Sequence, residues 1–294
     1  MPRIVPYYAP IWESIRFDRG LAHAFCFRRW DIARLVLSQG GSMDWEDVYG
    51  RTPLSVALIA HHSLESTPET QKEAHRFISG TDIAERLGFT PLHTAILQNS
   101  PEELLQYLHV DLTHLNAQDN LGRTPLVLAS CHSSDKAARI LLECGADPEI
   151  TDRSKRSPLH FAAQRAPGIV QALMELCDEQ RLSRLLEAID VRGCTVVYFA
   201  IEFNQWRILT DLCARGLRVD VKDNLQRTIL HYAAWTGEAE VMDVLSQQDL
   251  SSVDLGALDS YGRTAEQCFT SLRHDVKTNT TEAFQRLMAA ASRS

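Results

Sequence analysis

The 294-residue sequence lacks any apolar run of the roughly 18 residues that a membrane-spanning helix needs. Its first twenty residues also lack a basic start followed by an apolar core, so no secretory signal is expected. These two absences predict a chain that does not enter a membrane and that resides in the cytoplasm or the nucleus.

Motifs for metal binding and catalysis are also missing. The seven cysteines are scattered, and none forms a CxxC pair or a Cys/His cluster with metal-ligand spacing. No nucleotide-binding, zinc-protease or hydrolase signature stands in a suitable context. Cys131 and His132 are adjacent and could suggest a nucleophile and its base, but neighbours on a helix point about 100° apart. We therefore expect no cofactor, no metal, no catalytic residue and reduced thiols.

A surplus of positive charge is absent as well. The chain has 30 Lys and Arg against 38 Asp and Glu, a formal net charge of −8. Proteins that bind nucleic acid neutralise phosphates with a basic surface, so nucleic acid is an unlikely partner. Hydrophobic residues make up 45% of the chain and charged residues 23%, which is typical of a folded protein.

What the sequence does contain is a short pattern that recurs every 33 to 38 residues. It reads GRTPLSVA, GFTPLHTA, GRTPLVLA and KRSPLHFA, and continues more loosely as GCTVVYFA, QRTILHYA and GRTAEQCF. A degenerate unit precedes the first copy, with Arg19 at the equivalent position. The Thr or Ser of each pattern anchors its unit: Thr52, Thr90, Thr124, Ser157, Thr195, Thr228 and Thr264.

Each unit predicts two short antiparallel helices and a turn. A Thr or Ser before Pro begins a helix, as at Thr90, Thr124 and Ser157, because the hydroxyl caps a free N–H and Pro suits the first helical position. Ser100 begins a second helix in the same way, with Pro and two Glu following it. Gly145 ends a second helix, since a left-handed cap favours glycine.

This pattern resembles the start of the ankyrin repeat, whose unit is about 33 residues long. The resemblance covers roughly residues 19–275 and implies an all-α solenoid of antiparallel helix pairs with protruding β-turn loops. Units would start near 19, 52, 90, 124, 157, 195, 228 and 264. We expect residues 1–18 to form an N-terminal capping segment and 276–294 a C-terminal capping helix, with extra residues after Cys177 in a loop.

The resemblance also implies roles for particular side chains. His93, His160 and His231 would hydrogen-bond backbone atoms between adjacent units. Asn116 stands where some ankyrin proteins carry a hydroxylated asparagine, although a turn-stabilising role is the preferred interpretation.

A non-catalytic scaffold or adaptor that binds a protein through the concave groove and the turn tips is the implied function. The predicted tips contain eight Arg and no Asp or Glu, which favours an acidic segment as partner. Trp235 and Phe203 are large apolar residues on a face expected to be wet. The predicted partner-binding residues are Tyr49, Arg51, Arg86, Phe89, Leu121, Arg123, Arg153, Arg156, Arg165, Arg192, Phe203, Leu225, Arg227, Trp235, Tyr261 and Arg263.

Three other interpretations remain open at this point. An acidic residue begins each turn and could neutralise the tip arginines, which would then serve the fold. An enzyme or a small-molecule-binding protein could use a pocket in the groove. Nucleic-acid binding through the arginines is the third.

Overall fold

The computed structural model describes residues 87–216, 218–272 and 278–292. The chain divides into two compact units, Met1–Arg86 and Leu87–Ser294, and all described residues belong to the second. The expected N-terminal capping segment, the units starting near 19 and 52, and the predicted contacts Tyr49, Arg51 and Arg86 lie outside the described residues.

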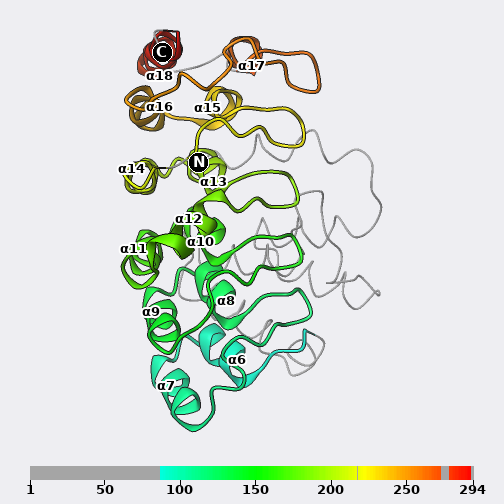
Figure 1. The fold of residues 1–294 in the computed structure, drawn as a ribbon, viewed down its shortest axis with the longest axis vertical. Coiled ribbons are helices and arrows are strands. Elements are labelled where there is room, and N and C mark those ends of the chain that lie inside the picture. The colour runs from blue at the N-terminus through cyan, green and yellow to red at the C-terminus, as the bar shows by residue number, and fades with distance from the viewer. Residues whose placement is uncertain (1–86, 217, 273–277, 293–294) are drawn as a thin grey trace, which may run out of the picture. The chain divides into compact units, whose positions relative to one another are not determined.

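Within the described ranges, helices form two parallel rows and no strand is present (Figure 1). In each row, every helix packs on the next. The first helices of the units are α6 Pro91–Leu97, α8 Pro125–Cys131, α10 Pro158–Ala162, α13 Val196–Glu202, α15 Ile229–Thr236 and α17 Ala265–Leu272. The second helices are α7 Pro101–Val110, α9 Asp135–Glu143, α11 Pro167–Leu176, α14 Trp206–Cys213, α16 Ala239–Ser246 and α18 Thr278–Ala291.

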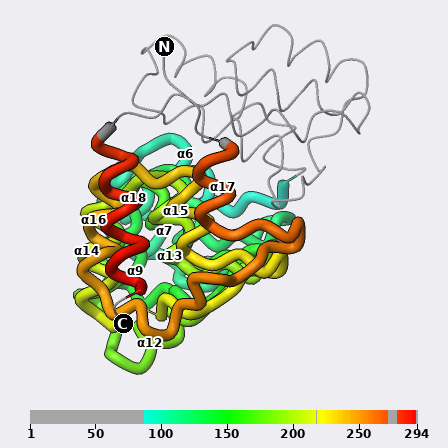
Figure 2. Tube along the Cα trace, turned by 90° about the horizontal axis from the view of Figure 1, so that it is seen from above, coloured from blue at the N-terminus to red at the C-terminus, as the bar shows by residue number. Residues whose placement is uncertain are grey.

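Turns link each second helix to the next first helix and project to one side of the first row (Figure 1). Figure 2 shows the two rows from above, with α15 and α17 in one and α16 and α18 in the other. The expected all-α solenoid of helix pairs is therefore confirmed.

The predicted helix starts are confirmed. Thr90, Thr124 and Ser157 are the N-caps of α6, α8 and α10, and each of these helices begins at the following Pro. The Ser100 hydroxyl accepts a hydrogen bond from the Glu103 backbone N–H at 3.4 Å. Gly145 follows α9 with a φ of +88°, as a left-handed cap requires.

The core runs along the whole described stack. Two positions after five of the six described anchors stands a buried apolar residue: Leu92, Leu126, Leu159, Val197 and Leu230. The first helices of neighbouring units pack on one another and on their own second helices, so this burial depends on stacking. The solenoid is therefore held by contacts between neighbours along the sequence.

The extra residues after Cys177 are not a loop, which corrects the expectation. They form a further helix, α12 Glu179–Glu187, whose N-cap Asp178 accepts a hydrogen bond from the Arg181 backbone N–H at 2.7 Å. One face of α12 is buried through Leu182, Leu185 and Leu186. The insertion folds because it carries both a cap and an apolar face at helical spacing.

The C-terminal helix α18 packs on α16, as each second helix packs on the one before it. Phe284 stacks on Phe269 of α17 with ring centroids 4.1 Å apart, and Leu287 is buried. Arg286 forms an ion pair with Asp243 of α16 at 2.8 Å. Helix α18 thus stands as the second helix of the unit that begins at Thr264.

Candidate partner-binding surface

Each described turn is closed by the Asp that begins it. At the first complete turn, Asp119 Oδ1 accepts hydrogen bonds from the backbone N–H groups of Leu121 at 2.9 Å and Arg123 at 2.8 Å. Asp223 and Asp259 make the same pair of bonds in their turns. Because the carboxylate satisfies two backbone donors, each turn is held in one shape.

The same Asp binds an arginine through its other oxygen. Arg123 Nε donates to Asp119 Oδ2 at 2.8 Å, and an Arg156 terminal nitrogen donates to Asp152 Oδ2 at 2.9 Å. Arg123 and Arg156 are both buried. This corrects the expectation that they are exposed tip contacts: their charges are neutralised inside the turns, and they serve the fold.

In the turn before Thr195, the arginine that pairs with the Asp comes from a different position. Cys194 occupies the position that arginine takes in the other described turns, and Arg192 replaces it as the partner of Asp190, with Nε to Oδ2 at 3.0 Å. Arg192 also lies 3.7 Å from a Glu202 carboxylate oxygen. Arg192 is therefore engaged by two carboxylates.

The paired arginines of the turns also lie over aromatic rings of the first helices. Arg156 lies over the Phe161 ring at 4.6 Å and Arg192 over Phe199 at 5.0 Å. Each ring stands four residues after its anchor, so the pairing repeats along the stack. Cation–π contact with a desolvated guanidinium stabilises the junction between turn and helix.

Trp235 belongs to the largest of these clusters. Its ring lies 5.0 Å from the Arg227 guanidinium and 5.7 Å from that of Arg263, and the Tyr232 ring centroid is 6.0 Å away. Arg227 is ion-paired with Asp223. Trp235 is half-buried between two neighbouring units, and part of its apolar surface is already used by the fold.

Two predicted contacts at the inner ends of the first helices remain available. Phe203 directly follows α13 and is 42% exposed. Arg165 follows α10 and is half-buried, and burial lowers the pKa of its guanidinium. Among the residues that the structure describes, no carboxylate is ion-paired with Arg165. Both residues stand eight positions after their anchors, and α10 and α13 pack together.

The remaining predicted tip residues differ in exposure. Arg153, Leu225 and Tyr261 are exposed, and Arg263 is about one-third exposed while paired with Asp259. Leu121 is buried, which corrects its assignment as a contact. Phe89 is half-buried, with its ring stacked on His93 at 5.6 Å.

The predicted histidine bonds are confirmed for two units. His93 Nδ1 accepts a hydrogen bond from the Thr90 backbone N–H, so its Nε2 carries the proton and donates to the Arg123 carbonyl at 2.9 Å. His231 Nε2 donates to the Arg263 carbonyl at 3.0 Å. These bonds join one unit to the next.

Sequence reasoning missed the residue that replaces histidine in the Thr195 unit. Tyr198 stands in the same slot, and its hydroxyl donates to the Arg227 carbonyl at 3.2 Å and contacts the Val221 carbonyl. The sequence did carry a signal for it. In GCTVVYFA, the tyrosine stands three residues after the Thr anchor, where the copy GFTPLHTA has histidine.

The buried thiols are poor nucleophiles. Burial raises the pKa of Cys131 and of Cys194 to about 12, so both remain protonated near neutral pH. In the described part of the chain, no group of His, Cys, Asp or Glu is arranged to hold a metal ion. No helix in that part has the length and apolar character needed to cross a membrane.

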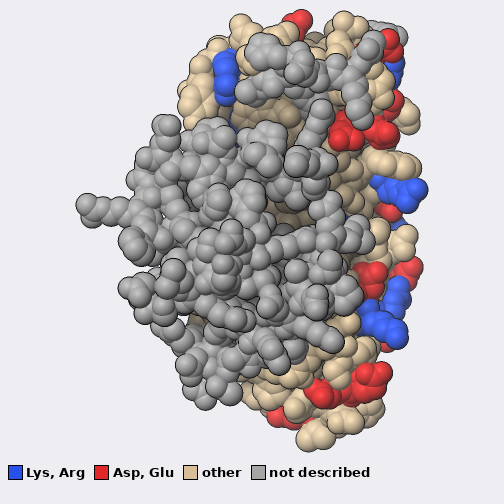
Figure 3. Space-filling model, turned by 180° about the vertical axis from the view of Figure 1, so that it is seen from behind, with Lys and Arg blue, Asp and Glu red and all other residues tan. Residues whose placement is uncertain are grey.

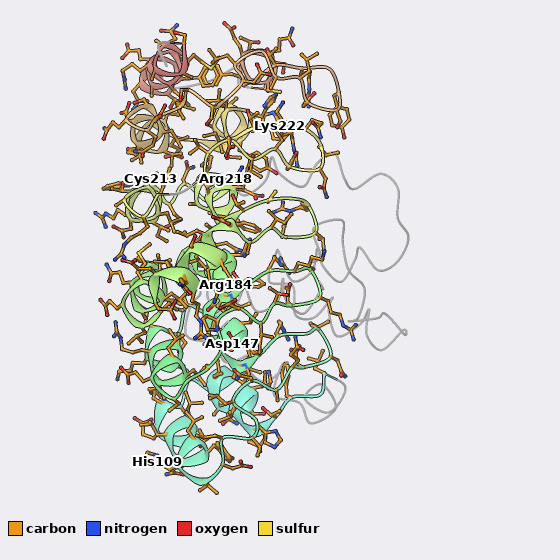
Figure 4. All side chains as sticks on the ribbon, viewed as in Figure 1. His109, Asp147, Arg184, Cys213, Arg218 and Lys222 are labelled. Atoms are coloured by element: carbon orange, nitrogen blue, oxygen red, sulfur yellow. The ribbon has the colours of Figure 1, made fainter. Side chains whose placement is uncertain are left out.

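The outer edge formed by the second helices carries charges of both signs. Figure 3 shows blue and red side chains next to one another along this edge. Arg139 pairs with Glu175 at 2.9 Å, and Arg184 of α12 pairs with Glu149 at 2.7 Å. Figure 4 shows Arg184 and Asp147 near each other. Exposed pairs of this kind contribute little stability.

A family model described as "Ankyrin repeats (3 copies)" matches residues 69–152, 101–182 and 159–259. Three curated relatives illustrate the similarity. The human transient receptor potential cation channel subfamily A member 1 is 28% identical over 186 residues, covering 63% of this chain and 16% of the relative. Mouse NF-kappa-B inhibitor alpha is 32% identical over 136 residues, covering 45% and 43%. The mouse B-cell lymphoma 3 protein homolog is 29% identical over 140 residues, covering 46% and 31%.

Solved structures agree on the fold. An ankyrin repeat domain from Acinetobacter baumannii AYE superposes with a TM-score of 0.55 at 22% identity, covering 68% of this chain and 97% of that domain. The ankyrin repeat protein EF0377 gives 0.53 at 19% identity, covering 69% and 96%. The chain spans less than half the length of the curated relatives named above. Since the family model matches well over half of the chain, this protein belongs to the ankyrin repeat family.

Proposed function

We propose that this chain is a non-catalytic scaffold that binds another protein through the inner ends of its first helices and its turn tips. The observation that supports it most is the pair formed by Phe203 and Arg165 on neighbouring units. The two residues stand at equivalent positions of units whose first helices pack together, and aromatic and Arg side chains are enriched in interface hot spots. The relative named NF-kappa-B inhibitor alpha is by its name an inhibitor of another factor, which agrees with an interaction role.

The proposed surface is narrower than the sequence predicted. It consists of Phe203 and Arg165 with the exposed part of Trp235, and it continues to the turn tips. We propose a cytoplasmic or nuclear location, because the described helices cannot span a membrane and the composition is that of a folded protein.

The proposal of a non-catalytic role is supported by the state of the reactive groups. Both ring nitrogens of His93 are engaged in hydrogen bonds, and the raised pKa of Cys131 keeps its thiol protonated. A general base needs a free nitrogen near its substrate, and a nucleophilic cysteine needs a lowered pKa. His93 instead joins two neighbouring units by a hydrogen bond, and Cys131 is buried in the core.

A comparative pull-down tests the groove. The full chain, the double variant Arg165→Ala/Phe203→Ala and a control Lys136→Ala/Gln171→Ala would be immobilised, and the bound proteins quantified by mass spectrometry. Lys136 and Gln171 are exposed on the second helices, so the control removes similar side chains elsewhere. We expect one set of proteins to bind the parent and the control, and to bind the groove variant at least tenfold less. Equal recovery on all three, with unchanged melting temperatures, would contradict the groove assignment.

A further inference from the structure

The tips of four consecutive turns form a row with different chemistry at its two ends. We call this row the tip ridge and define it by Arg153, Lys155, Val191, Leu225 and Tyr261, all of which are exposed. Its geometry is set by backbone hydrogen bonds between neighbouring turns, so the side chains have fixed neighbours.

One end of the tip ridge is basic. Arg153 and Lys155 lie on the turn whose carboxylate, Asp152, is already bound to Arg156. Among the described residues, neither Arg153 nor Lys155 is in an ion pair. By contrast, the arginines of the other described turns are paired with their own Asp: Arg123, Arg192, Arg227 and Arg263. The Asp152 turn therefore presents two exposed charges that its own carboxylate does not neutralise.

The other end is apolar. Val191 is 43% exposed, Leu225 is 38% exposed and Tyr261 is 69% exposed, on three successive turns. Leu121, which stands at the position of Leu225 and Tyr261 in an earlier turn, is buried. Exposed apolar groups that lie in a row next to charged groups are typical of interaction surfaces, whereas isolated ones are not.

The spacing along the tip ridge fits an extended peptide. The Val191 N–H donates to the Ser154 carbonyl at 3.0 Å, and the Ser260 N–H to the Leu225 carbonyl at 2.8 Å, so consecutive turns lie side by side. Packed helices lie about 8–10 Å apart, so three steps from the Arg153 turn to the Tyr261 turn span roughly 25–30 Å. An extended chain rises about 3.3 Å per residue, so about nine residues cover that length.

We propose that the tip ridge binds an extended segment of a partner protein, about nine residues long, with acidic side chains at one end and apolar side chains at the other. The acidic end lies over Arg153 and Lys155, and the apolar end lies over Leu225 and Tyr261. This inference rests on the proposed scaffold function and adds the chemistry and the direction of the bound segment. A nucleic acid fits less well, because phosphates would need cations along the whole row.

A peptide-display selection tests this chemistry. Random 12-residue peptides displayed on phage would be selected on the full chain, and enriched peptides would be measured by fluorescence anisotropy. We expect enriched peptides to carry Asp or Glu at one end and apolar residues at the other. Arg153→Glu/Lys155→Glu should raise Kd at least tenfold and flatten its salt dependence. Leu225→Ser/Tyr261→Ser should also raise Kd at least tenfold, while the salt dependence stays.

The control for charge is Lys136→Glu/Arg215→Glu, which changes the net charge equally at exposed sites away from the tips. Its Kd should match that of the parent within about twofold.

Enriched peptides that lack acidic residues, or that bind both tip variants as tightly as the parent, would overturn the tip ridge. If the same peptides lose binding only with Arg165→Ala/Phe203→Ala, the tip ridge is wrong and the scaffold proposal stands. If no peptide depends on either surface, both proposals fail.

Discussion

At the residue scale, the residue type at the fourth position of a turn decides whether the backbone there is strained. The fourth residue of each turn that the structure describes in full has a positive φ, and it is glycine at Gly122, Gly193 and Gly262. Lys155 and Gln226 occupy the same position with φ of +58° and +59°. An L side chain in this region costs roughly 1 kcal/mol, because Cβ crowds the carbonyl oxygen. Those two turns therefore carry strain that the glycine turns avoid.

We predict that Gln226→Gly raises the free energy of unfolding by up to about 0.5 kcal/mol, because the strain relieved, roughly 1 kcal/mol, is partly offset by the entropy that glycine adds to the unfolded chain. Urea denaturation followed by circular dichroism measures it. Gly122→Ala should have the opposite sign, because its Cβ would lie 2.8 Å from the Arg153 backbone nitrogen. A Gln226→Gly variant less stable than the parent would show that its backbone is unstrained.

At the element scale, helices α12 and α18 depend on burying an apolar face. Helix α12 forms from inserted residues, and its apolar side chains Leu182 and Leu185 are buried. Its Arg184 and Arg181 both bind Glu149, at 2.7 and 3.1 Å, and these hydrogen bonds lower the pKa of that partly exposed carboxylate. Helix α18 completes the last unit by covering α16. Without it, the apolar face of α16 would meet water.

We predict that Phe284→Ala lowers the free energy of unfolding by about 3 kcal/mol or more, because a large buried ring is removed from contact with Phe269. Thermal and urea unfolding of the full chain measure the loss. Gln285→Ala is the matched control, since Gln285 is the exposed neighbour on the same helix. If Phe284→Ala unfolds at the parental urea concentration, α18 is not a stabilising cap.

At the scale of the whole molecule, stability is distributed along the stack through bonds between adjacent units. His93, Tyr198 and His231 each reach a carbonyl of the next unit. His93 and His231 use the neutral ring, since Nδ1 accepts from a backbone N–H while Nε2 donates. Protonation would remove the acceptor, so acid should loosen several junctions together.

The pH dependence follows from burial. Burial lowers the pKa of His160 to about 4, and it also lowers those of His93 and His231 below the usual 6.5. As the pH falls below 6.5, the unfolded chain takes up more protons at these rings than the folded chain does. The stabilisation is therefore complete above pH 6.5 and is lost as the pH falls toward 4.

We predict that lowering the pH from 7 to 5 costs about 2 kcal/mol for His160 alone. Urea unfolding at both values measures the difference in the free energy of unfolding. His160→Gln should be less stable than the parent at pH 7 and should show a smaller loss between the two values. An equal loss in the variant would assign the pH dependence to other groups.

The amino-acid sequence by itself determined the units and their helix starts, because a cap, a proline and a periodic apolar face act over a few residues. The histidine bonds of His93 and His231 were implied by the resemblance to the ankyrin repeat, not by local propensity. Only the tertiary structure decided that Arg123 and Arg156 turn inward onto Asp119 and Asp152. It also decided that the segment after Cys177 folds against the stack as α12. A charged side chain near a turn can face water or a carboxylate, and an amphipathic insertion folds only where a surface accepts it. Neither outcome is fixed by local propensity, because both depend on what neighbouring units bury.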